Sequence, residues 1–142
     1  MHKSLVEGLS ERLKAVYAKL PIGHPEHEGT LVGPLVDEHA WHAMRDALAI
    51  AESQGGRVFG GTRVTEDVPP GGFYVNPAIV AIDAEAPIVQ QETFAPILYL
   101  IPYDTLDEAI TLHNNVPQGL ASAIFTNDVR EAEAFCSASG SD

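Results

Sequence analysis

Two residues in one extended stretch have types and a spacing suited to binding a nucleoside. Glu92 and Phe94 lie two positions apart, immediately before an apolar run. Side chains with that spacing share one side of an extended segment. A carboxylate there can accept hydrogen bonds from two neighbouring hydroxyls, as on a ribose, and an aromatic ring can pack on the same ligand. From spacing alone the ligand role is the weaker interpretation, because exposed acids before strands are common.

Two His-x-x-His pairs raise metal binding as an alternative chemistry. His24 and His27 fall in a loop rich in glycine and proline, whereas His39 and His42 fall on a predicted helix. The helical pair is close enough to share a metal, but a structural zinc site needs three or four converging ligands. No such set is visible in the sequence, so both pairs are interpreted as polar surface and no metal is expected.

Cys136 is the only cysteine, which excludes a disulfide within the chain and fits a reducing compartment. It falls beside Phe135 on the predicted inward side of the last helix, with no histidine within several residues. We therefore expect a small buried hydrophobe rather than a nucleophile, and we assign no catalytic residue. The glycine pairs are interpreted as turns, because Thr62 follows Gly61 where a phosphate-binding loop needs lysine.

The elements that position these residues follow from hydrophobic periodicity and from start and stop signals. The sequence predicts helices over 5–20 and 37–54, strands over 57–59, 74–82 and 97–103, a helix opened by the capping box 105–108, a strand over 120–125, and a last helix opened at 128–131. The strand, helix and strand from 97 to 125 are typical of a crossover, so these two strands should be parallel neighbours. The predicted fold is α/β, with three αβα layers around a mainly parallel sheet.

The overall charge narrows the partners that we expect. The chain has 20 acidic and 8 basic residues and a formal net charge of −12, which argues against nucleic acid and anionic membranes as partners. Its 142 residues are one domain's worth of protein. The sequence has neither a signal peptide nor an apolar run approaching the length of a membrane span. We therefore expect a cytoplasmic protein.

Four motifs in a fixed order resemble the aldehyde dehydrogenase superfamily. Residues 92–98, Glu-Thr-Phe-Ala-Pro-Ile-Leu, resemble its Glu-x-Phe-Gly-Pro signature. The other three motifs are Gly-Pro-Leu at 33–35, Gly-Phe-Tyr-Val-Asn-Pro at 72–77, and Asn115 with Gly-Leu at 119–120 and Ile-Phe-Thr at 124–126. Ala95 in place of the usual glycine, together with the final Gly-Ser-Asp, is similar to the α-aminoadipic semialdehyde dehydrogenase (antiquitin) branch.

The resemblance implies roles for three residues. Members of this family oxidise aldehydes to acids by cysteine attack, hydride transfer to NAD and hydrolysis of the thioester. Glu92 corresponds to the glutamate that holds the nicotinamide ribose hydroxyls, Phe94 to the aromatic residue packed at that end of the cofactor, and Leu120 to a leucine near the nicotinamide. The resemblance therefore implies NAD as the cofactor of the parent enzyme, with these three residues at its binding site.

The resemblance also implies that much of the family's site lies outside these residues. The nucleophilic cysteine, the general-base glutamate, the oxyanion-stabilising asparagine and the dinucleotide-binding domain fall upstream of residue 1, and the oligomerisation strand follows residue 142. We expect 1–142 to be a partial catalytic domain, inactive alone, from an oxidoreductase of lysine catabolism acting on α-aminoadipic semialdehyde. The alternative is a non-catalytic α/β module that associates with dehydrogenase subunits. Exposed sheet edges predict a homo-oligomer.

Overall fold

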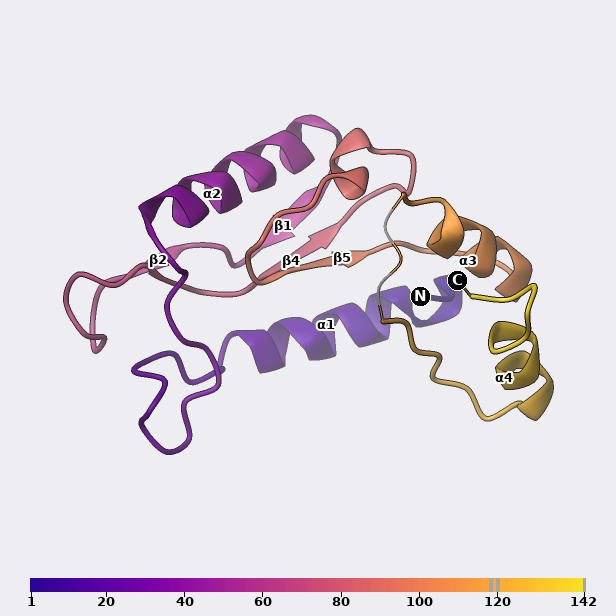
Figure 1. Cartoon of the computed structure of the whole chain (residues 1–142), viewed down its shortest axis with the longest axis horizontal. Helices are drawn as coiled ribbons and strands as arrows, with labels where there is room; N and C mark the ends of the chain where they lie inside the picture. The colour runs from indigo at the N-terminus through magenta and orange to yellow at the C-terminus, as the bar shows by residue number, and fades with distance from the viewer. Residues whose placement is uncertain (118, 120, 142) are drawn as a thin grey trace.

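The computed structural model describes residues 1–117, 119 and 121–141. The described elements, labelled in Figure 1, are η1 (Lys3–Leu5), α1 (Val6–Tyr17), α2 (Glu38–Ser53), β1 (Arg57–Phe59), β2 (Arg63–Val64), β3 (Tyr74–Val75), β4 (Ala78–Ala81), η2 (Pro87–Gln90), β5 (Ile97–Leu100), α3 (Leu106–Asn114) and α4 (Val129–Phe135). Helices lie on both sides of a sheet that contains a parallel strand pair (Figure 1), so the predicted α/β class is confirmed.

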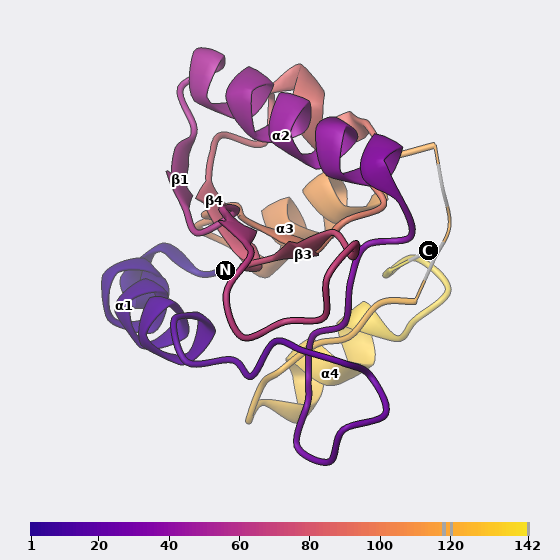
Figure 2. The same cartoon turned by 90° about the vertical axis from the view of Figure 1, so that its left-hand side faces the viewer.

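The central sheet is mixed, with strand order β1-β4-β5. β4 runs parallel to β5, with Ile79 opposite Leu98, whereas β1 runs antiparallel to β4, with Val58 opposite Val80. Helix α2 lies over one face of the sheet and α1 lies on the other side, which gives the three predicted layers (Figures 1 and 2). β2 and β3 form a separate antiparallel pair.

The core lies between α2 and the sheet, and it follows from the periodicity of α2. Met44, Ala47, Leu48 and Ala51 recur on one side of the helix and are all buried, because residues three and four apart share a helix face. Asp37 caps the helix by accepting a hydrogen bond from the Ala40 amide at 2.8 Å. The predicted helix over 37–54 therefore matches the observed helix and its two capping residues.

The far end of α2 is tied to the segment that carries the candidate site. The Gln54 side-chain oxygen accepts a hydrogen bond from the Ile88 amide of η2 at 2.9 Å. Ile88 is 2% exposed and belongs to the core. η2 therefore has a fixed position against α2, and the chain leaves it towards Glu92.

The predicted amphipathic character of the first helix is confirmed, but its apolar face is only partly covered. Ser10 is the buried residue of α1, whereas Leu5 and Val16 are 55% and 57% exposed. A cavity of about 450 Å³ separates α1 from the sheet. α1 therefore contributes less buried apolar area to the described fold than α2 does.

Two predicted strands are shorter in the structure. The predicted strand over 74–82 divides into β3 and β4 at Asn76 and Pro77, because proline has no amide hydrogen for a sheet ladder. The predicted strand over 97–103 ends at Leu100, two residues before Pro102.

The predicted strand over 120–125 is wrong for the residues that the structure describes. Residues 121–125 have no strand assignment, and Phe125 is 98% exposed. A strand needs a neighbouring backbone to complete its hydrogen bonds. The backbone that follows β5 pairs with the N-terminal residues instead. The Lys3 amide donates to the Tyr103 carbonyl at 2.9 Å, and the Tyr103 amide donates to the Met1 carbonyl at 3.0 Å. The expected parallel neighbour of β5 is thus replaced by a short bridge between His2 and Tyr103.

Candidate cofactor site

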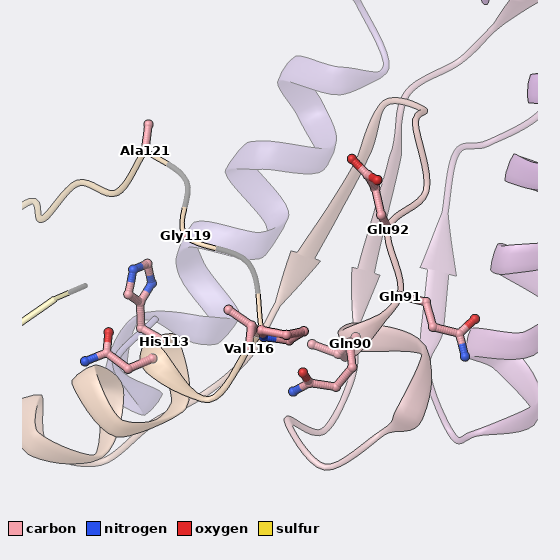
Figure 3. A pocket seen from close by; sticks show the side chains of 10 residues that line it. Gln90, Gln91, Glu92, His113, Val116, Gly119 and Ala121 are labelled. Atoms are coloured by element: carbon pink, nitrogen blue, oxygen red, sulfur yellow. The ribbon is translucent and has the colours of Figure 1, made fainter.

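Glu92 stands on a short irregular segment between η2 and β5 (Figure 3). The backbone on both sides of it is held by local hydrogen bonds. The Gln91 amide donates to Ile88 at 3.1 Å, and the Ala95 amide donates to Thr93 at 2.8 Å, which closes a three-residue turn. The Glu92 side chain is exposed and has no hydrogen-bond or ion-pair partner among the described residues. Its carboxylate is therefore available to a ligand.

A cavity of about 290 Å³ adjoins Glu92. Residues 89–92 form one wall, and the end of α3 with the following loop forms the other (Figure 3). Gln90 joins the two walls, because its side-chain amide donates to the Asn115 carbonyl at 2.8 Å. On the α3 side, the Asn114 side chain donates to the Gly140 carbonyl at 2.7 Å. Hydrogen bonds therefore connect the segments that surround the cavity.

The three predicted cofactor residues have different positions relative to this cavity. Glu92 lines it. Phe94 does not line it within the described part of the chain, and its side chain is 84% exposed. Leu120 lies outside the described residues. The structure therefore places Glu92 beside a cavity without bringing Phe94 to it, and the roles assigned to all three residues remain predictions.

His113 lines the same cavity, and it was not predicted from the sequence. It occupies the last turn of α3, with its ring 6.0 Å from the Phe135 ring of α4. The available signal was its position two residues before Asn115, within a segment that carries a family motif. The sequence separation of Glu92 and His113, with 20 residues between them, hid this proximity, because only the path through β5 and α3 brings them together.

The two histidine pairs do not form a metal site within the described residues. The His24 and His27 rings are 5.1 Å apart, and His42 lies 3.8 Å from the Glu38 carboxylate. In the described part of the chain, no three His, Cys, Asp or Glu side chains converge as metal ligands. A structural zinc site needs three or four ligands, and the described residues supply no third ligand to either pair.

The expectation that Cys136 faces inward is wrong. Its side chain is exposed, whereas Phe135 is half-buried. α4 ends at Phe135, and Cys136 is the C-cap residue with φ −87° and ψ 1°. The prediction extended the helical pattern to Cys136, whereas the helix ends one residue before it.

Burial raises the pKa of the Tyr99 phenol, which is on β5 and away from the cavity. The Tyr99 oxygen is buried and has no hydrogen-bond partner among the described groups. Desolvation favours the neutral form of a phenol, so the direction of the pKa shift follows from burial alone.

No described helix is long and apolar enough to cross a membrane.

The chain belongs to the aldehyde dehydrogenase family, because the sequence profile of that family matches residues 1–139. Aldehyde dehydrogenase family 7 member A1 of Pisum sativum is 42% identical over 142 residues, which are all of this chain and 27% of the pea protein. α-Aminoadipic semialdehyde dehydrogenase of Bos taurus is 39% identical over 143 residues, which cover all of this chain and 26% of the bovine protein. The resemblance to the antiquitin branch is therefore confirmed.

Solved structures agree with the fold. Betaine aldehyde dehydrogenase from Staphylococcus aureus in complex with NAD⁺ matches with a TM-score of 0.87 and 26% identity, over 93% of this chain and 27% of that one. The described chain thus has the fold of one part of an aldehyde dehydrogenase, and it spans about a quarter of the relatives that it matches.

Proposed function

We propose that this chain forms the nicotinamide-ribose side of the cofactor site in an NAD-dependent aldehyde dehydrogenase. The observation that carries the proposal is the unpaired Glu92 carboxylate beside a cavity, in a chain of this family. NAD is supported as the cofactor by the staphylococcal neighbour, whose structure holds NAD⁺. The substrate proposed for the parent enzyme is α-aminoadipic semialdehyde, since a bovine relative has that activity in its name.

The proposed role of Glu92 is to orient the nicotinamide. Its two oxygens accept hydrogen bonds from the two ribose hydroxyls, which fixes the rotation of the ribose and therefore of the ring attached to it. Hydride transfer needs that ring at short range and in a defined orientation. Hydrogen bonds to a charged group contribute about 1.5–3 kcal/mol each, net of exchange with water.

We further propose that residues 1–142 do not oxidise aldehydes by themselves. The only thiol, Cys136, is exposed on the C-cap of α4 and does not line the described cavity around Glu92. No hydrogen bond joins this thiol to a base among the described residues, so it lacks the activation that a nucleophilic cysteine needs. The proposed activity belongs to a longer polypeptide, and the localisation proposed for it is the cytoplasm.

The second candidate function is association with dehydrogenase subunits without catalysis. It is favoured by exposed apolar side chains on the C-terminal segment, where Phe125 and Val129 are 98% and 69% exposed. Exposed apolar patches often mark protein interaction surfaces. Homo-oligomerisation of the parent enzyme, which we also propose, would cover the same kind of surface.

A chimera tests the proposed function. This chain replaces the corresponding 27% of the pea protein, and NADH formation is measured with α-aminoadipic semialdehyde and NAD. We expect turnover by the chimera and none by the 142-residue chain. Glu92→Gln in the chimera should lower kcat/KM for NAD by about tenfold, which corresponds to about 1.4 kcal/mol.

The matched control is Glu85→Gln, which makes the same change at an exposed glutamate. Unaltered kinetics in Glu92→Gln would refute the ribose role. NADH formation by the isolated chain, tracking the protein through purification, would refute its proposed inactivity and would make Cys136 the first residue to replace.

A further inference from the structure

The far end of helix α3 lacks the local cap that commonly closes a helix. A helix often ends with glycine at the position after the C-cap, followed by a residue whose amide donates back to the helix. Here Asn115 is the C-cap residue, and Val116 and Pro117 occupy those two positions. Valine rarely adopts the left-handed conformation that glycine provides, and proline has no amide hydrogen to donate. The last carbonyls of α3 therefore depend on donors from elsewhere in the chain.

Gln90 supplies one such donor from the other wall of the cavity. Its side-chain amide donates to the Asn115 carbonyl at 2.8 Å, across a sequence separation of 25 residues, and Figure 3 shows Gln90 beside Val116. The backbone that carries Gln90 is fixed, because Ile88 is 2% exposed and its amide donates to the Gln54 side chain at 2.9 Å. The core therefore holds Gln90 in place, and Gln90 in turn holds the start of the loop after α3.

We propose that Gln90 is a positioning residue of the cofactor site, which holds the loop after α3 at a fixed spacing from Glu92. This inference rests on the proposed cofactor role of Glu92. The cavity of about 290 Å³ lies between these two segments, so the Gln90 hydrogen bond fixes the spacing of its walls. In sequence the loop continues to Leu120, which the family resemblance assigns to the nicotinamide, and the nicotinamide is joined directly to the ribose that Glu92 binds. Two walls at the correct spacing contact one ligand without a further ordering step, which raises affinity.

The test measures binding of nicotinamide riboside, which has the ribose and the nicotinamide without a phosphate. The 142-residue chain and its variants are titrated with the riboside, and dissociation constants are obtained from NMR shifts. Gln90→Met removes the donor but keeps an uncharged side chain of similar length, and we expect it to weaken binding by about three- to fivefold. It should also shift the amide resonance of Val116, whose peptide group includes the Asn115 carbonyl. Gln90→Lys, which keeps an N–H donor on a long side chain, should retain most of the wild-type affinity.

The matched control is Gln91→Met, which makes the same change at the next residue. Gln91 is exposed and also lines the cavity, but its side chain has no hydrogen-bond partner among the described residues. This variant should alter neither the dissociation constant nor the Val116 resonance. Both methionine variants should keep the wild-type urea midpoint, because the Gln90 hydrogen bond is exposed.

Three results would overturn the positioning role and leave that of Glu92 intact. They are equal weakening by Gln90→Met and Gln91→Met, a shifted Val116 resonance with unaltered affinity in Gln90→Met, and an unshifted Val116 resonance in that variant. Wild-type affinity in Glu92→Gln would instead overturn the proposed function. Absence of binding by the folded wild-type chain would overturn both.

Discussion

Gln54 should control both the stability of the chain and the position of the cavity wall. Its side-chain oxygen accepts the hydrogen bond of the Ile88 amide at 2.9 Å, and Ile88 is 2% exposed. Gln54→Ala leaves this amide without its acceptor in a buried environment. An unsatisfied buried backbone donor costs about 1–3 kcal/mol, so we expect the free energy of unfolding to fall by about that amount. Gln54→Glu keeps an oxygen at the same distance along the side chain and should restore most of it.

Urea denaturation followed by circular dichroism measures this effect, and the midpoint and slope separate a stability change from a change in compactness. The matched control is Glu52→Ala, on the exposed surface of the same helix, which should alter the free energy by less than about 0.5 kcal/mol. NMR should show the largest shift changes for Gln54→Ala at the backbone amides from Ile88 to Glu92. A free energy of unfolding for Gln54→Ala equal to that of Glu52→Ala would refute the reasoning.

Three further predictions concern the sheet and a turn beside it. Tyr99→Phe removes a buried hydroxyl without a partner among the described groups and should stabilise the chain by about 1 kcal/mol in urea denaturation. Burial raises the pKa of Tyr99, so the phenol ionises at a lower pH in the unfolded chain than in the folded chain. The free energy of unfolding of the wild type should therefore fall as pH rises through about 10. The same alkaline loss in Tyr99→Phe would contradict this prediction. Gly60 and Gly71 both have a positive φ, +81° and +84°, which alanine rarely adopts. A Cβ at Gly60 would lie 2.2 Å from the Pro77 carbonyl oxygen, whereas a Cβ at Gly71 would meet no atom within 4 Å. Gly60→Ala should therefore cost more than about 1 kcal/mol beyond Gly71→Ala in thermal unfolding, and equal losses would show that the close approach is relieved.

The elements that were predictable from the sequence are those fixed by local interactions. The start of α2 follows from the Asp37 cap, and the buried side of the helix follows from the spacing of residues such as Met44 and Ala51. β1 was likewise predicted with its observed bounds. The predicted strand over 120–125 required a neighbour, and the described backbone beside Tyr103 pairs with the N-terminal residues instead. Pairing between distant segments is a tertiary property that periodicity does not encode.

The candidate site shows the same division between local and distant information. Glu92 could be selected because a motif surrounds it, and the structure places it beside a cavity. His113 could not, since its relation to Glu92 depends on the path through β5 and α3. Cys136 was misplaced because a pattern was extended past the last residue of α4. Residue type and spacing therefore indicated one wall of the cavity, and the fold was needed to identify the other.

The exposure of Glu92 is compatible with a positioning role because its backbone, rather than its side chain, is held in place. On one side the segment is bonded to η2, which Gln54 fixes against α2. On the other side it enters β5, whose parallel register with β4 is set by four residue pairs. A short segment anchored at both ends loses little further backbone freedom when a ligand binds, so less of the interaction energy is spent on ordering it. Water still competes for the carboxylate in the described chain. Affinity should therefore be weak in the 142-residue chain and stronger in the chimera, where further protein surrounds the cavity and the same carboxylate acts in a drier environment.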